Sequence, residues 1–252
     1  MSHQADAHGE HPPHLAHHFE TVEQQFDTAK LGMWTFLLTE VMFFSVLFVA
    51  YAVYRSNHED AFQYASQFLD TNLGAINTVV LLLSSLTAAW AVRCAQLGNT
   101  KGIMLNLAIT VLCACGFMGI KYQEYSHKYH EGLLWGGADH SIFKADPADV
   151  MESVKVSHVE GHESAWDAYG VEQLDPGFRR QVGIFFGIYF CLTGLHGIHV
   201  VIGIIVILWL MRRNMRGDFT PEKYDAVDLG ALYWHLVDLI WIYLFPLLYL
   251  IS

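Results

Sequence analysis

Charged residues are scarce in this 252-residue sequence: 15% are Asp, Glu, Lys or Arg, whereas 53% are hydrophobic. The few charges gather in segments that are separated by long apolar runs. A soluble domain of this length needs charged residues along every element to cover its surface. Uncharged stretches of about 20 residues instead match the length of a helix that crosses a bilayer. The composition therefore excludes an ordinary soluble domain and indicates an integral membrane protein.

Basic residues and cysteines are also few. The chain has 14 Lys and Arg against 25 Asp and Glu, a formal net charge of −11, and no long basic stripe. Phosphate binding requires a basic face, so we predict no nucleic-acid partner. Four cysteines in or beside apolar runs do not suit a disulfide framework of the secreted kind, and we interpret them as small packing residues. They are Cys94, Cys113, Cys115 and Cys191.

Residues 1–30 form a polar, His-rich tail that lacks the basic region and short apolar core of a cleavable signal peptide. Six histidines lie around Pro12 and Pro13, and such a tract can bind a transition metal loosely. Adjacent prolines interrupt helical spacing, however, and no carboxylate or cysteine completes a defined geometry. We therefore assign the tail no metal site and no function.

Five apolar runs predict five transmembrane helices, since backbone inside lipid must satisfy its own hydrogen bonds and the alternation of barrel strands is absent. The predicted spans lie near 31–54, 73–95, 103–122, 182–211 and 230–251. The expected fold is all-α: a single five-helix membrane domain over 31–252, with an enlarged extramembrane loop, 123–181, between the third and fourth helices. That loop is too long for a simple connector, so we expect a small cap there, either merely solvated or in contact with a partner.

The distribution of Lys and Arg predicts the orientation. The loop 212–229 contains four basic residues, and the tight turn near 96–102 is flanked by Arg93 and Lys101. Both connections lie on the same side as the N-terminus, and short basic loops favour the cytoplasm. We therefore predict a multi-pass protein of the bacterial inner membrane with a cytoplasmic N-terminus. The C-terminus and the segment 121–181 are expected on the periplasmic side.

Ionisable residues inside the predicted spans need an explanation, because each costs about 2.5–3.5 kcal/mol at the bilayer centre. Glu40 lies about 14 Å along the first span, at about 1.5 Å per residue. His196 and His199 share one helix face in the fourth span, and His235 and Asp238 share one in the fifth. Two interpretations stay open: interhelical clamps or groups linked to protons.

Glycines surround the histidines of the fourth span and predict close approach of a neighbouring helix. They are Gly183, Gly187, Gly194, Gly197 and Gly203.

A bis-His haem site needs histidines that face one another and room for a macrocycle, which two histidines on one face fit poorly. No Cys and His set has copper-ligand spacing. A b-type membrane cytochrome is thus a minor alternative. A proton-coupled transporter is another, but no internal repeat is visible.

Several stretches together resemble one family. They are Leu31 to Phe44 with Glu40, Ile76-Asn77-Thr78, Tyr122-Gln123-Glu124-Tyr125, Thr193 to Val200, and Tyr233 to Trp241. In this order they resemble subunit III of the haem-copper terminal oxidases, which include cytochrome c oxidases and quinol oxidases, in its five-helix bacterial form. The two N-terminal helices that build the lipid-holding cleft of the mitochondrial form have no counterpart.

The resemblance implies a non-catalytic subunit, without a redox centre or catalytic residues, in a respiratory oxidase that reduces oxygen to water with proton pumping. It implies subunits I and II as partners that carry the haem and copper, and phospholipid as a bound lipid. A cytochrome c or a quinol-oxidising complex, as in a supercomplex, is a further candidate partner. The resemblance identifies Glu40 as the buried acid of the family, with polar neighbours at His196, His199, His235 and Asp238. Asn77 and Glu124 are secondary polar residues.

Overall fold

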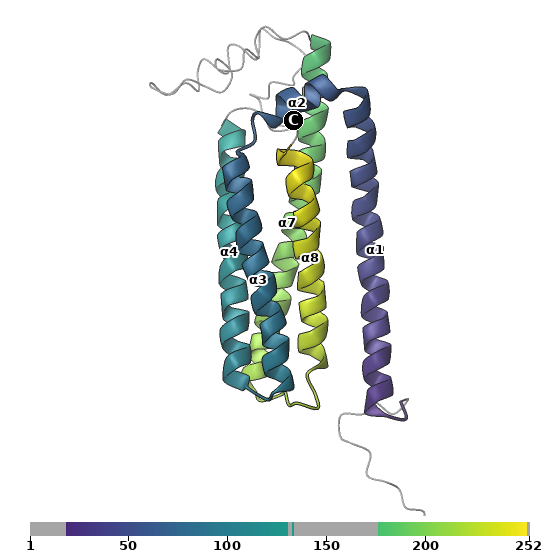
Figure 1. Ribbon diagram of the computed structural model, residues 1–252, viewed down its shortest axis with the longest axis vertical. Helices are drawn as coiled ribbons and strands as arrows, with labels where there is room; N and C mark the ends of the chain where they lie inside the picture. Colours follow the sequence, from purple (N-terminus) through teal and green to yellow (C-terminus); the bar gives the residue numbers. More distant parts are fainter. Residues whose placement is uncertain (1–18, 131–132, 134–175, 251–252) are drawn as a thin grey trace, which may run out of the picture. The chain divides into compact units, whose positions relative to one another are not determined.

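The computed structural model describes residues 19–130, 133 and 176–250 (Figure 1). The histidines of residues 1–18 and most of the predicted outer loop therefore lie outside the described residues. The helices are α1 (Val22–Asn57), α2 (Glu59–Ser66), α3 (Thr71–Gln96), α4 (Thr100–His130), α7 (Pro176–Met215) and α8 (Asp225–Tyr249).

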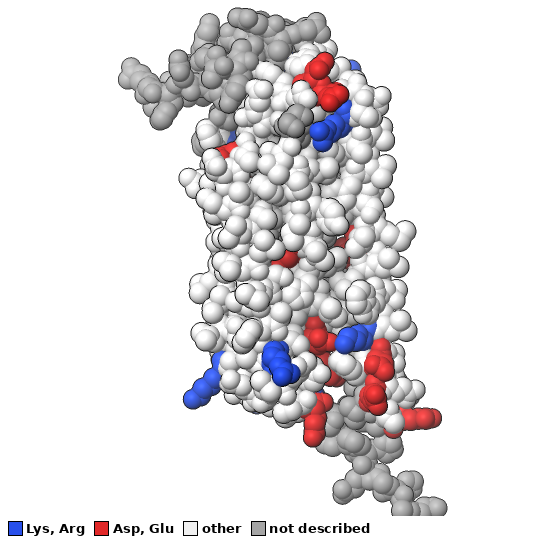
Figure 2. Space-filling view, viewed as in Figure 1, with Lys and Arg blue, Asp and Glu red and all other residues white. Residues whose placement is uncertain are grey.

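Five of these helices are long and apolar enough to cross a membrane, and only α2 is short. The predicted all-α fold with five spans is confirmed, and no strand occurs in the described part of the chain beyond an isolated bridge between Thr220 and Lys223. The chain is thus a multi-pass membrane protein. In Figure 2 the charged side chains gather mainly toward the ends of the helices, with a wide, mostly uncharged stretch between them.

Two helices extend beyond their predicted spans into the expected loop 123–181. Helix α4 continues from the predicted end at 122 to His130, and α7 begins at Pro176 rather than near 182. The two added turns of α4, at about 3.6 residues per turn, include charged and polar residues, which hydropathy alone assigns to a loop. The side chains of Glu124 and Lys128 are nonetheless buried, as described below, so packing against other helices contributes to where α4 ends.

Local hydrogen bonds and one glycine explain where α3 begins and how the chain turns from α3 into α4. At the start of α3, the carboxylate of Asp70 accepts hydrogen bonds from the backbone N–H groups of Asn72 at 2.8 Å and Leu73 at 3.3 Å. At its end, Gly98 has a φ of +69°, the left-handed conformation that glycine adopts without a steric penalty. The Asn99 side chain then accepts from the N–H of Gly102 at 3.0 Å and starts α4.

The chain divides into two compact units, residues 1–42 and 43–252. The first contains the N-terminal half of α1, whose described residues are mostly exposed and apolar. In the second, α3 packs against α4 and α8, and α7 packs against α8, α4 and α2. Trp234 and Trp241 of α8 are fully buried at the centre of this bundle.

Glycines of α7 play two different roles in this packing. A Cβ at Gly203 would lie 2.7 Å from the ring of Trp234, so this glycine permits the predicted close approach of α8. Gly197 has no atom within 4 Å of such a Cβ, and Gly194 has only the Tyr125 hydroxyl at 4.0 Å. The prediction of close approach is therefore wrong for these two glycines, because they border open space.

Candidate functional site

The polar residues of α8 hydrogen-bond to two consecutive serines of α3. His235 Nδ1 lies 2.7 Å from Ser85 Oγ, and Ser84 Oγ donates to Asp238 Oδ2 at 3.3 Å. The indole N–H of Trp234 donates to the same Ser84 hydroxyl at 3.0 Å. The three-residue spacing that puts His235 and Asp238 on one face of α8 thus directs both toward α3. We call these five residues the serine seam.

The histidines of α7 have different surroundings. His196 is fully buried, with its ring 5.3 Å from the ring of Trp241 and 5.6 Å from that of Phe117. Neither ring nitrogen of His196 has a hydrogen-bond partner among the described residues. His199 is only partly buried: its Nδ1 lies 2.8 Å from the Leu195 carbonyl, and its ring lies 5.2 Å from that of Phe44.

A second polar cluster lies where α4, α7 and α8 meet, and its centre is the carboxylate of Glu124. Lys121 Nζ donates to Glu124 Oε2 at 2.7 Å, and Lys128 Nζ donates to Oε1 at 2.8 Å. The hydroxyls of Tyr189 and Tyr249 donate to Oε1 at 2.8 and 2.7 Å. All five side chains are buried. We call this group the ion cluster.

Lys121 also contacts residues of α8. Besides Glu124, its ammonium donates to the Tyr249 hydroxyl at 2.5 Å and lies 4.6 Å from the centre of the Trp241 ring. Desolvating ions is costly, and it is offset only where the geometry is good and further hydrogen bonds are made. Four donors to one carboxylate meet that requirement. The cluster therefore joins three helices.

Most of the ion cluster escapes sequence reasoning. The sequence identifies Glu124 only as a secondary polar residue. It places Lys121 and Lys128 among the basic residues of the outer segment 121–181. The spacing of three and four residues from Lys121 to Glu124 to Lys128 is the available signal, since such residues share a helix face. Tyr189 and Tyr249 carry no comparable signal, because their role depends on α7 and α8 reaching the same point.

Two other predicted site residues lie elsewhere. Asn77 of α3 is fully buried, and neither atom of its amide group has a hydrogen-bond partner among the described residues. Glu40 is half-buried on α1, in the unit that ends at Met42. The proximity of Glu40 to the histidines stays a prediction.

The described residues contain no group of three or more His, Cys, Asp or Glu side chains placed to hold a metal ion. Two of the three histidines predicted as site residues use a ring nitrogen in a hydrogen bond. Nδ1 of His199 pairs with the Leu195 carbonyl, and Nδ1 of His235 pairs with Ser85. The ring of His196 lies beside the rings of Phe117 and Trp241.

Known proteins resemble this chain over most of its length. The family described as Cytochrome c oxidase subunit III matches residues 10–131 and 132–252. A quinol oxidase subunit 3 from Bacillus spizizenii is 28% identical over 234 residues, covering 92% of each chain. A cytochrome c oxidase subunit 3 from Thermostichus vulcanus is 27% identical over 229 residues, covering 90% of this chain and 89% of the relative. The chain therefore belongs to the cytochrome c oxidase subunit III family.

Proposed function

We propose that this chain is the accessory subunit III of a respiratory haem-copper terminal oxidase, packed against the catalytic subunit I and near subunit II. The observation that carries the proposal is the family match, which extends over nearly the whole chain and includes all five membrane helices. Haem, copper and oxygen reduction belong to the partner subunits in this proposal. The role of the chain itself is to stabilise subunit I and to support its uptake of protons.

The surface of the helices supports a role in a complex. Leu31, Trp34, Leu38 and Met42 on α1 are each about half exposed or more. Among the five candidate spans, α1 has the smallest buried share and α8 the largest. An apolar helix in a membrane can present such a face to lipid or to another subunit, because lipid tails and apolar side chains are similar surroundings. We assign the exposed face of α1 to contact with subunit I.

The polar residues divide into two proposed roles. The bonds of His235 and Asp238 to the serines of α3 support a structural role for the seam as an interhelical clamp. Glu40 is the proposed proton-linked acid. An acidic side chain near the middle of a span is costly to place in the membrane, so its presence points to a function. His196 and His199 are proposed as its polar neighbours.

Burial of the lysines supports a cytoplasmic N-terminus. Lys121 and Lys128 pair with Glu124 inside the bundle, so they do not act as free loop charges at the end where α4 terminates. The opposite end keeps exposed basic residues, including Lys101, Arg212 and Arg216. This asymmetry favours the cytoplasm for the end with the exposed charges. We place the protein in the bacterial inner membrane on this basis.

Purification of the tagged full-length chain from its native membrane tests the proposal. We expect a haem-bearing subunit to co-purify, with a haem band in the reduced-minus-oxidised absorbance spectrum. A stable preparation that contains no oxidase partner would refute the assignment. Haem bound by the chain alone would favour the membrane cytochrome, and proton-driven solute uptake in liposomes by the chain alone would favour the transporter.

A further inference from the structure

The polar side chains of the serine seam differ in how deeply they are buried. Ser84, Trp234 and Asp238 are buried, whereas Ser85 and His235 are partly exposed. Helices α3 and α8 pack side by side (Figure 1). The hydrogen bond between Ser85 and His235 therefore lies at the outer edge of this packing, where it reaches the surface of the bundle.

Apolar residues surround this polar pair. Leu239 follows His235 by four residues and Leu82 precedes Ser85 by three, so each leucine shares a helix face with its polar neighbour. About half of each leucine side chain is exposed, and Ile242, three residues beyond Leu239, is exposed as well. We call these five residues of α3 and α8 the α3–α8 face.

The imidazole of His235 lies near the middle of the membrane. His235 is 10 residues after Asp225 and 14 before Tyr249, the two ends of α8, or about 15 and 21 Å at about 1.5 Å per residue. The hydrocarbon core is about 30 Å thick. Long basic side chains near helix ends can reach the headgroups, but an imidazole at this depth cannot. A polar ring on an outer face at this depth therefore needs a protein neighbour.

The ring of His235 has one nitrogen bonded within the described residues. Nδ1 lies 2.7 Å from Ser85 Oγ, and Nε2 has no hydrogen-bond partner in this part of the chain. In one neutral tautomer Nε2 is a donor, and in the other it is an acceptor. A hydroxyl or a carboxamide side chain suits either tautomer, because both groups donate and accept hydrogen bonds. A lipid acyl chain can do neither.

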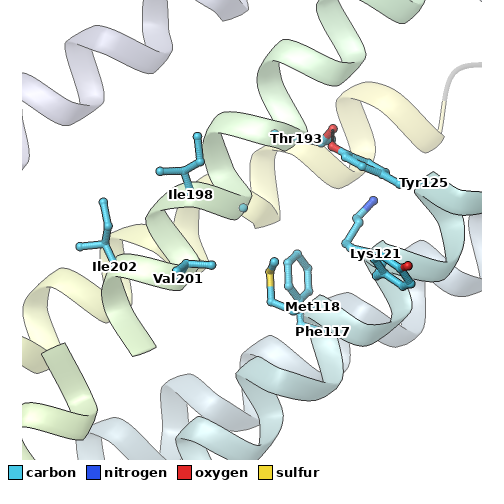
Figure 3. Close-up of a pocket in the computed structure, with 11 residues that line it drawn as sticks. Phe117, Met118, Lys121, Tyr125, Thr193, Ile198, Val201 and Ile202 are labelled. Atoms are coloured by element: carbon cyan, nitrogen blue, oxygen red, sulfur yellow. Dashed lines mark hydrogen bonds between the residues drawn. The ribbon is translucent and has the colours of Figure 1, made fainter. Parts of the chain in front are cut away.

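Another opening at the surface of the bundle differs in this respect. Figure 3 shows apolar side chains of α4 and α7 around a pocket, with Tyr125 and Thr193 at one end. The Tyr125 and Thr193 hydroxyls lie 2.5 Å apart, and Thr193 donates to the Tyr189 carbonyl at 2.7 Å. Those two hydroxyls form their hydrogen bonds within the chain. The α3–α8 face is therefore better suited to a polar contact with another protein.

We propose that the α3–α8 face binds a transmembrane helix of another subunit, and that a hydroxyl or carboxamide side chain of that helix hydrogen-bonds to Nε2 of His235. The leucines and Ile242 pack against apolar side chains of the same helix. This surface belongs to different helices from the face of α1 that we assign to subunit I. The contact does not require the partner to be an oxidase subunit, so it does not rest on the proposed function.

Photocross-linking of the full chain in its native membrane tests the contact. Benzophenone-bearing phenylalanine replaces Leu239 in one variant and Leu112 in a control. Leu112 is 71% exposed and lies about 18 Å along α4 at about 1.5 Å per residue, a similar depth. We expect position 239 to cross-link to a membrane-spanning segment of another protein, with a Ser, Thr, Tyr, Asn or Gln side chain at that depth. The yield should be at least about fivefold higher than from position 112, in line with one interhelical hydrogen bond.

Three results of this experiment would overturn the proposal. They are lipid adducts alone at position 239, a cross-link to a second copy of this chain, and a partner segment without a hydroxyl or carboxamide at that depth. A cross-link to a suitable segment in a membrane complex without haem would uphold the contact while refuting the oxidase assignment.

Two variants then test the hydrogen bond itself. His235→Phe keeps a ring but removes both nitrogens, whereas Ser85→Ala breaks the bond to Nδ1 and leaves Nε2 in place. In detergent, we expect the partner to dissociate about three- to thirtyfold more readily from His235→Phe, the range for one interhelical hydrogen bond in a membrane, and to be retained by Ser85→Ala. Unchanged retention in His235→Phe would refute the contact. Equal losses in both variants would assign the effect to the serine seam and overturn the proposal.

Discussion

Replacing Glu124 by glutamine tests whether the ion cluster joins α4, α7 and α8. The substitution keeps the shape of the side chain but removes the negative charge, so that the buried ammonium groups of Lys121 and Lys128 lose the carboxylate that they share. Breaking a buried ion pair by removing one partner costs about 3–5 kcal/mol. The carboxylate accepts four hydrogen bonds, each worth about 1.5–3 kcal/mol when a charged group takes part. Their sum is an upper limit, because the glutamine carbonyl still accepts some of them.

We therefore expect Glu124→Gln to lower the free energy of unfolding by about 4 kcal/mol, within the range for a broken buried pair. The assay is unfolding of the purified chain by titration with sodium dodecyl sulfate, monitored by tryptophan fluorescence. Gln123→Ala, at the exposed neighbouring position on α4, is the matched control and should change stability by less than about 0.5 kcal/mol.

A triple variant separates the charge effect from simple loss of packing. If Lys121→Met and Lys128→Met are combined with Glu124→Leu, the ion cluster keeps no ionisable lysine or carboxylate, and most of the lost stability should return. A loss below about 1 kcal/mol in Glu124→Gln would refute the reasoning, since a buried ion cluster does not tolerate removal of the carboxylate at its centre. The same conclusion would follow if the triple variant were less stable than Glu124→Gln, because uncompensated charge would then not be the cause.

Three further predictions follow from single positions. Glu40→Ala should leave assembly intact while slowing proton uptake or shortening the period of turnover, measured by oxygen consumption of the purified oxidase over many minutes; unchanged turnover would leave Glu40 a structural residue. Ser85→Ala removes the hydrogen-bond partner of His235 and should cost about 1–3 kcal/mol in the same detergent titration, whereas an unchanged midpoint would show that His235 is satisfied otherwise. Gly203→Leu should destabilise the bundle by about 1–3 kcal/mol or more, since its Cβ would lie 2.7 Å from Trp234, while leucine at an open glycine of α4 should be tolerated.

The surroundings of the polar residues were only partly predictable. A spacing of three residues is sufficient to put His235 and Asp238 on one face of α8, because helix geometry is local. The identity of their partners, Ser84 and Ser85, depends on the register between α3 and α8, which no local pattern contains. The same holds for His196, whose aromatic neighbours come from α4 and α8.

Glycine spacing shows the limit of one-dimensional reasoning most directly. Gly194, Gly197 and Gly203 are equivalent in the sequence, since each is a small residue on an apolar helix. In the structure a Cβ at Gly203 would meet Trp234, whereas the other two line an open apolar pocket between α4 and α7. A small residue permits close approach, but only the position of the neighbouring helix determines whether the space is filled.

The amino-acid sequence by itself determined the membrane location, the five spans and the all-α fold. These follow from a single requirement, that every backbone polar group inside lipid be hydrogen-bonded within its own segment, which makes a long apolar run a helix whatever surrounds it. Only the tertiary structure decided that Lys121, Glu124 and Lys128 are buried rather than part of a loop. Their burial depends on the hydroxyls of Tyr189 and Tyr249, which are distant in sequence, and so on helix packing rather than on hydropathy.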